Sequence, residues 1–187
     1  MKINRKIISF IILLSVLGSS SLFALKIGGK NLPDTMKAGE TELILNGAGL
    51  RKKVVIKVYA AALYLPSQNN DSTKITAADE AMSIKMHFIY KAVDPAKLIE
   101  AWDTGFAKSD VTNLQAEIAT FNSYFTNDAK KNDIYDIIYV PEEGTSLYIN
   151  DTLQGTIKGL EFKKALFNIW LSADTELPGL RSKMLGL

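Results

Sequence analysis

The chain of 187 residues contains no cysteine and a single histidine. The absence of cysteine excludes a disulfide framework, a thiolate metal site, a cysteine nucleophile and a lipid-anchored cysteine. One histidine cannot supply a His-rich metal motif, and the sequence has neither a nucleophile elbow nor a phosphate-binding glycine loop. We therefore expect no metal site, no cofactor and no chemistry that needs a strong general base.

Apolar runs of membrane-spanning length are missing as well, although the N-terminus carries a shorter one. Three basic residues precede an apolar run over residues 7–17, and small residues follow it up to Ala24. This layout is typical of a secretory signal peptide; the alternative is an N-terminal helix packed on the fold. We expect cleavage of residues 1–24, a single domain over 25–187, and a periplasmic or secreted protein that does not span a membrane.

An excess of charge of either sign is also lacking once the N-terminal segment is set aside. The full chain has 22 Lys and Arg against 20 Asp and Glu, and residues 1–24 hold three of the basic side chains and no acidic one. The remaining 19 basic and 20 acidic side chains give a net charge of −1. This balance offers little attraction to a polyanion, so we expect no nucleic-acid partner. Protein partners stay unknown at this point.

The clearest strand that the sequence predicts lies over residues 82–90, where apolar and polar side chains alternate. Its apolar face carries Met82, Ile84, Met86, Phe88 and Tyr90. The polar face carries Ser83, Lys85 and His87. We interpret His87 as an ordinary surface residue and not as a catalytic base, because no second titratable group lies at a telling spacing.

Helices are predicted after this strand and again towards the C-terminus. Asp94 and Pro95 supply an N-cap and a first-turn proline, and Leu98, Trp102 and Phe106 then recur every four residues. A second helix near Asp110 or Thr112, strands over 133–140 and 145–149, and helices after Gly159 and around Leu180–Leu185 follow. This order predicts an α+β domain with helices gathered on a mostly antiparallel sheet. The aromatic stripe of the helices is interpreted as core, with the lining of a ligand cavity as the alternative.

The stretch over residues 46–66 says most about function. Its first residues, Asn-Gly-Ala-Gly, tolerate positive φ, so we predict a tight turn there and a long strand over 53–65. Arg51 lies at the mouth of this strand, and Tyr59 lies on the same face, about 26 Å further along an extended chain. A bend or bulge near residues 50–53, or a long amphipathic ligand, is needed for both side chains to serve one pocket.

Arg51 and Tyr59 together indicate a pocket that accepts an anion. A guanidinium keeps its charge when partly buried and offers a planar fork to a carboxylate or phenolate, and a tyrosine adds a hydroxyl. The alternatives are a surface or structural ion pair for Arg51 and half-buried packing for Tyr59.

Two motifs frame this stretch: Gly47-Ala48-Gly49-Leu50-Arg51 and Lys57-Val58-Tyr59-Ala60-Ala61-Ala62-Leu63-Tyr64-Leu65. Together they resemble the signature of the chalcone isomerase-like proteins, specifically their secreted bacterial branch. The resemblance continues through Ile84 to Tyr90, Gly144-Thr145 and Phe162 to Leu171, and it ends near Gly186. It therefore covers nearly the whole chain after residue 24.

The resemblance implies an open-faced β-sandwich, in which a large antiparallel sheet is backed by a helical layer with a ligand cleft between them. In the plant enzymes this cleft cyclises a chalcone phenolate into a flavanone, and the arginine that Arg51 matches stabilises the negative charge. Relatives in plastids bind fatty acids, with the arginine and a tyrosine holding the carboxylate. Tyr59 stands where the plant enzymes carry a threonine, and the region Asp94–Lys97 has no match for their water-ordering tyrosine.

The resemblance leaves three functions open. The first is a binding module for a small amphipathic acid, a fatty acid or a phenolic, with Arg51 engaging the acidic group and Tyr59 assisting. The second is an isomerase of the chalcone-flavanone type, an intramolecular lyase that uses Arg51 as an electrostatic catalyst, so whether the protein is an enzyme stays open. The third is a non-catalytic envelope interaction protein whose cleft is vestigial.

Overall fold

The computed structural model describes residues 24–187. The strands are β1 (Ala24–Ile27), β2 (Lys30–Pro33), β3 (Thr35–Ala38), β4 (Thr41–Lys53), β5 (Ile56–Leu65), β6 (Met82–Phe88), β7 (Ala92–Val93), β8 (Ala129–Lys130), β9 (Ile134–Val140), β10 (Gly144–Ile149) and β11 (Thr152–Ile157). The helices are α1 (Ser72–Ala77), α2 (Pro95–Phe106), α3 (Gln115–Ser123), α4 (Leu160–Leu171) and α5 (Pro178–Met184). The predicted signal peptide, residues 1–24, lies outside the described residues except for Ala24.

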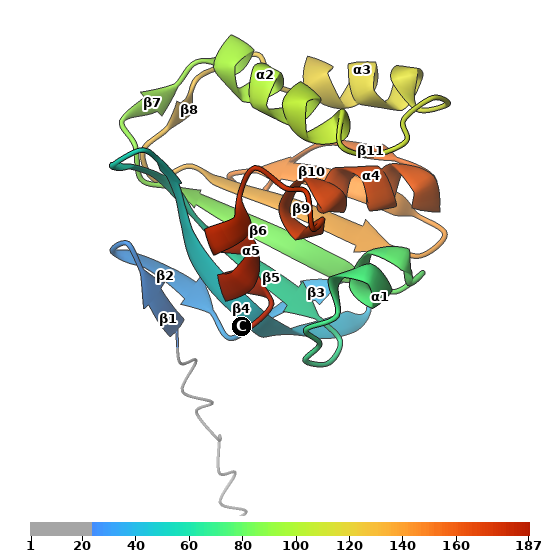
Figure 1. Ribbon diagram of the computed structural model, residues 1–187, viewed down its shortest axis with the longest axis horizontal. Coiled ribbons are helices and arrows are strands. Elements are labelled where there is room, and N and C mark those ends of the chain that lie inside the picture. Colours follow the sequence, from blue (N-terminus) through green and yellow to red (C-terminus); the bar gives the residue numbers. More distant parts are fainter. Residues whose placement is uncertain (1–23) are drawn as a thin grey trace, which may run out of the picture.

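Seven of the strands form one sheet in the order β11-β10-β9-β6-β5-β4-β3, and every neighbouring pair is antiparallel. Helices α2, α3 and α4 gather on one side of this sheet, and the β1–β2 hairpin lies apart from them (Figure 1). The predicted α+β architecture, a large antiparallel sheet backed by a helical layer, is confirmed.

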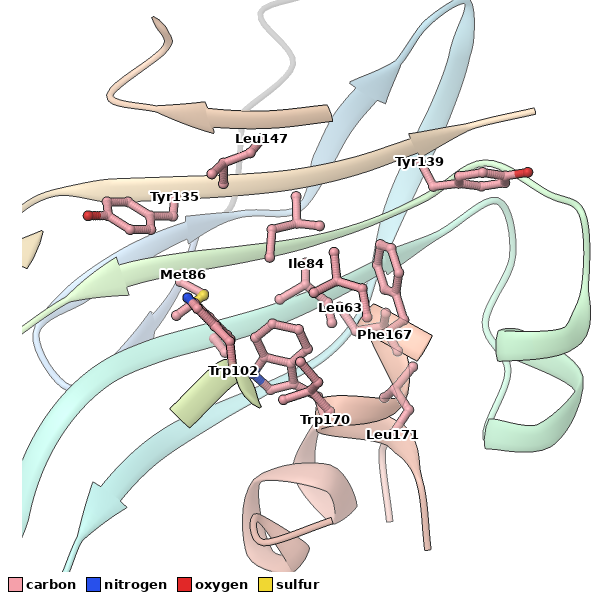
Figure 2. Packing of buried hydrophobic residues seen from close by; sticks show 14 of the residues in the cluster. Leu63, Ile84, Met86, Trp102, Tyr135, Tyr139, Leu147, Phe167, Trp170 and Leu171 are labelled. Carbon is pink, nitrogen blue, oxygen red and sulfur yellow. The ribbon is translucent and has the colours of Figure 1, made fainter. Parts of the chain in front are cut away.

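The core lies between the sheet and the helices. The side chains of Tyr59, Ala61 and Leu63 on β5 point towards the helices, and they belong to the same core cluster as Phe167 and Trp170 of α4. Figure 2 shows these α4 side chains against the sheet residues Leu63, Ile84 and Met86. A second, smaller cluster covers the other face of the sheet; it consists of Leu32, Ala38, Leu43, Ala48, Ala60, Ala62, Tyr64 and Ala81.

Strand β6 follows the predicted alternation, with Met82 through Phe88 pointing every second side chain into the helix-side core. His87 lies on the opposite face, as predicted, but it is half-buried and not an ordinary surface residue. Burial lowers the pKa of His87, and the charges of Lys30 and Lys85 lower it further. The imidazole is therefore neutral near pH 7. It also lies on the opposite face of the sheet from Arg51, so the two side chains do not meet.

The predicted turn at residues 46–49 was wrong, because these residues run through the middle of β4. The reversal lies at Val54 and Val55 instead, and Val54 has a φ of +56°. Gly47 is glycine for another reason: a Cβ there would lie 2.3 Å from the carbonyl oxygen of Lys183. The small residue lets the end of α5 rest directly on the strand.

Candidate functional site

The β4–β5 register makes Arg51 and Tyr59 direct cross-strand partners. The reversal at Val54 and Val55 folds the chain back, so the eight residues that separate the pair in sequence do not separate them in space. Directly opposed residues on antiparallel strands point to the same face, with Cβ atoms about 5 Å apart. The bulge expected near residues 50–53 is present, between Arg51 and Lys52. The structure thus brings the two predicted site residues together on the helix-covered face.

The side chain of Tyr59 is buried, and Tyr59 is not among the residues that line the cleft beside Arg51. The indole nitrogen of Trp170 donates a hydrogen bond to its hydroxyl at 3.1 Å, and its ring lies 5.6 Å from that of Phe88. Burial raises the pKa of Tyr59 to about 12, against opposing effects of the Trp170 hydrogen bond and the charge of Arg51. The phenol is therefore neutral at physiological pH. Within residues 24–187 no protein group accepts its O–H, so the hydroxyl keeps one free donor.

Arg51 is partly exposed on the rim of an open cleft of about 610 Å³. Its guanidinium donates to the backbone carbonyl of Lys52, and within the described part of the chain no carboxylate lies within ion-pair distance of it. This differs from the structural ion pair that was the alternative for Arg51. A guanidinium held by backbone and facing a cleft is free to engage an anion.

Three segments far apart in sequence enclose the cleft. They are the end of β1 with Gly28, the second half of β4, and residues 176–183 with the start of α5. Gly49 lets α5 approach β4 here, because a Cβ on it would lie 2.9 Å from the Cβ of Lys183. The cleft thus depends on α5 resting closely on the strand.

The cleft is positively charged and partly apolar. Its charged lining residues are Lys26, Arg51, Lys52, Lys183 and Glu176. The single acid is engaged elsewhere: Glu176 pairs with Lys108 at 2.8 Å, and this lysine first and Arg51 last hold the pKa of Glu176 below its ordinary value. The apolar residues that line the cleft are Ile27, Ala48, Leu50, Leu177, Pro178 and Leu180. This combination suits a molecule with an acidic head and an apolar body.

The space under α2 and α3 is filled by aromatic side chains. The rings of Trp102 and Trp170 lie 5.4 Å apart, and those of Trp102 and Phe121 lie 5.8 Å apart. The stripe predicted as core is buried core. The cleft lies beside α5 and not beneath these helices.

Sequence reasoning identified Arg51 but missed the other walls of the cleft, of which Lys26, Glu176 and Lys183 are the charged members. The one signal available was the pair of glycines, Gly47 and Gly49, which in a strand mark a close approach of other chain. Read in that way, they predict a partner element on β4 without saying which.

Residues 24–187 contain no group of three or more His, Asp or Glu side chains arranged to hold a metal ion. Over the same range, none of the helices has the length and hydropathy required to cross a bilayer.

Comparison with known proteins agrees with this architecture. The model of the family described as chalcone isomerase-like matches residues 24–186. A solved structure of a fatty-acid-binding protein from Arabidopsis thaliana superposes with a TM-score of 0.70 at 17% identity, covering 84% of this chain and 92% of that one. At this identity the likeness concerns the fold alone. A search of curated proteins finds no match.

Proposed function

The chain belongs to the chalcone isomerase-like family, and from this premise we propose that it binds a small amphipathic acid, a fatty acid or a phenolic, in the cleft beside Arg51. The observation that carries the proposal is the state of Arg51. Its guanidinium faces a cleft with basic and apolar lining and has no carboxylate partner within residues 24–187. An acidic ligand supplies that partner and leaves its apolar part to Leu50 and Leu180.

Tyr59 adds a second contact to the proposed head-group site. It pairs with Arg51 across the two strands, it stays protonated near pH 7, and its O–H is the free donor of the pair. We propose that a carboxylate held by Arg51 accepts this hydrogen bond through its second oxygen, which requires the head group to reach past the cleft lining to the buried hydroxyl. Trp170, which donates to the same hydroxyl, then reports binding through its fluorescence.

The similarity to a protein named for fatty-acid binding supports the class of ligand. The likeness is one of fold, so it does not select among acids. Mass spectrometry of ligand carried through native purification tests the class without a prior choice of candidate.

We also propose that the protein is a member of the secreted bacterial branch and works in the periplasm or outside the cell. The support is the N-terminal pattern of basic residues, apolar run and small residues up to Ala24. N-terminal sequencing of protein from an envelope fraction tests it: a chain that starts near Leu25 is expected, and an unprocessed chain in the cytosol would contradict it.

Displacement of a fluorescent fatty acid measures the proposed function directly. Arg51→Gln removes the charge while keeping a polar side chain, and we expect a rise in Kd of roughly 10- to 100-fold, since hydrogen bonds to charged groups contribute about 1.5–3 kcal/mol. Lys74→Gln, which changes an exposed cation paired with Asp71, is the matched control and should leave Kd unchanged. Equal affinity of the wild type and Arg51→Gln, or no binding of any acid or phenolic, would refute the proposal.

The isomerase is a second candidate, favoured by the same unpaired guanidinium at a cleft. Arg51 there would stabilise a phenolate and the charge that develops during ring closure. Loss of chalcone absorbance above the spontaneous rate with a stereoselective product would support it. Racemic product at the background rate would count decisively against it.

A further inference from the structure

The β4–β5 hairpin ends in an exposed apolar tip. Figure 1 shows the hairpin, in teal, projecting away from the body of the sheet. Its end residues Val54, Val55 and Ile56 are 91%, 86% and 45% exposed, and they are consecutive in sequence. Three adjoining branched aliphatic side chains in water are unfavourable for a free surface, and such apolar patches mark interaction sites.

Basic residues surround this tip on both strands. Lys52 and Lys53 precede it, Lys57 follows it, and all three are exposed. Lys52 and Lys57 are direct cross-strand partners, an arrangement of like charges that destabilises a hairpin on its own. The acid that Lys53 influences, Glu100 on α2, is itself paired with Lys97 at 2.6 Å. Lys52, Lys53 and Lys57 therefore surround the tip with positive charge.

The turn itself is poorly suited to an isolated hairpin. Val54 adopts a φ of +56°, a conformation that glycine or asparagine adopts without strain and that a β-branched residue avoids. Val55 adds a second exposed aliphatic side chain where a polar residue suits the turn better. The fold gains no packing from either side chain, so their apolar character points to something outside the chain.

We propose that this tip, residues 52–57, docks the protein on the surface of an anionic phospholipid bilayer. The aliphatic side chains enter the boundary between head groups and acyl chains, and the lysines lie at the level of the phosphates. Apolar residues below and lysines around them are the pattern by which surface-bound proteins engage such membranes. Val54, Val55 and Ile56 do not line the cleft, which reaches the hairpin only as far as Lys52. A projecting apolar tip of this kind fits a deformable surface better than a preformed protein pocket. The inference stands without the proposed ligand.

Vesicle sedimentation tests the proposal with the chain from residue 24 onward, which contains every described strand and helix. The wild type is expected to bind phosphatidylglycerol-containing vesicles, to bind pure phosphatidylcholine weakly, and to lose affinity as salt rises. The double variant Val54→Ser with Val55→Ser should lose at least roughly 10-fold in affinity for anionic vesicles. Leu153→Ser, an exposed leucine at 50% on β11, is the matched control and should bind like wild type.

Charge is tested separately at two lysines that do not line the cleft. Lys53→Gln with Lys57→Gln should weaken vesicle binding by roughly 25-fold, about five-fold for each lysine. Lys37→Gln with Lys74→Gln removes two cations elsewhere and should have little effect. Circular dichroism and displacement of the fluorescent fatty acid show whether each variant keeps its fold and its cleft, so failure of membrane docking is distinguished from failure of ligand binding.

A tryptophan reporter gives an independent measurement. Val55→Trp places an indole at the tip, whereas Trp102 and Trp170 are buried and do not contact vesicles. A blue shift with anionic vesicles and quenching by brominated lipid are expected, and Leu153→Trp should show neither. Absence of vesicle binding, or binding that neither the tip variants nor the lysine variants weaken, overturns the proposal; the tip would then be a surface for a protein partner.

Discussion

Lys163 shows how one buried charge fixes the end of a neighbouring helix. Its ammonium group lies fully buried in α4 and donates to the carbonyl oxygens of Ile75, Thr76 and Ala78 at 2.9, 2.9 and 2.8 Å. These oxygens lie at the C-terminal end of α1, where a helix provides no donors of its own. The lysine replaces the water that such carbonyls otherwise need.

Lys163→Met keeps the apolar stem and removes the donor. We expect the free energy of unfolding to fall by about 3 kcal/mol at pH 7, because buried carbonyls lose a charged partner. Urea denaturation measures the change. Lys164→Met is the matched control on the same helix, since Lys164 is partly exposed and pairs with Glu161 at the surface. A loss no larger than that of the control would contradict this role.

The difference in stability between the wild type and Lys163→Met should also depend on pH. Burial lowers the pKa of Lys163 to about 8, below the value of 10.5 of the unfolded chain. Between these pH values the unfolded chain binds more protons, so the contribution of Lys163 to the free energy of unfolding rises with pH. The difference in stability between wild type and Lys163→Met should therefore widen from pH 8 to pH 10, and a narrowing would count against it.

Tyr59 has the opposite dependence on pH. Its pKa of about 12 in the folded chain lies above the unfolded value of 10, so the stability it contributes is present below pH 10 and is lost between pH 10 and 12. Tyr59→Phe removes this proton, and its unfolding free energy should fall less steeply over that range. Urea denaturation at several alkaline pH values measures the slope. Identical slopes for both proteins would show that the phenol is not protected by burial.

At the scale of elements, α5 can lie directly on β4 because Gly47 and Gly49 have no side chains. Gly47→Ala adds a Cβ 2.3 Å from the carbonyl oxygen of Lys183, so the end of α5 must move. We expect a loss of about 2 kcal/mol, a drop in Tm of roughly 4–8 °C, and weaker ligand binding, because the moved helix lines the cleft. Gly179→Ala in α5 is the matched control for stability alone, since Gly179 also lines the cleft: its Cβ meets nothing within 4 Å, and stability should hold or rise slightly.

The same contact explains why one hairpin was misplaced in the sequence analysis. Residues 46–49 have the composition of a turn and Val54-Val55 that of a strand, yet the structure assigns them the other way round. Local propensity yields here to tertiary packing: α5, more than a hundred residues later, occupies the room that Gly47 and Gly49 leave free. A single sequence does not reveal that contact.

Elements defined by their own residues were predicted well. Strand β6 shows its alternation in sequence, and α2 begins where expected, with the carboxylate of Asp94 accepting from the backbone N–H of Ala96 at 2.8 Å. Helix α3 was expected near Asp110 or Thr112 but begins at Gln115. In the turn before it, the carboxylate of Asp110 accepts a hydrogen bond from the backbone N–H of Thr112. Local capping signals place a helix within a few residues and not more closely.

At the scale of the whole molecule, fold class was predictable and the cleft was not. The order of strands and helices indicates an antiparallel sheet with helices on it, and the structure has this architecture. The cleft needs β1, β4 and residues 176–183 to converge, which is a property of the assembled chain. Arg51 was identifiable because its motif resembles a family signature, whereas Lys26 and Lys183 have no such mark.

The filled interior has a consequence for how long the proposed ligand stays bound. Because Trp102, Trp170 and Phe121 occupy the space between sheet and helices, the acyl or aromatic tail of a ligand bound as proposed would lie in the open cleft with one side in water. A tail that is only half enclosed leaves without any opening of the protein, so its dissociation is fast. Binding of the proposed kind would therefore suit transfer of a ligand between encounters better than its storage.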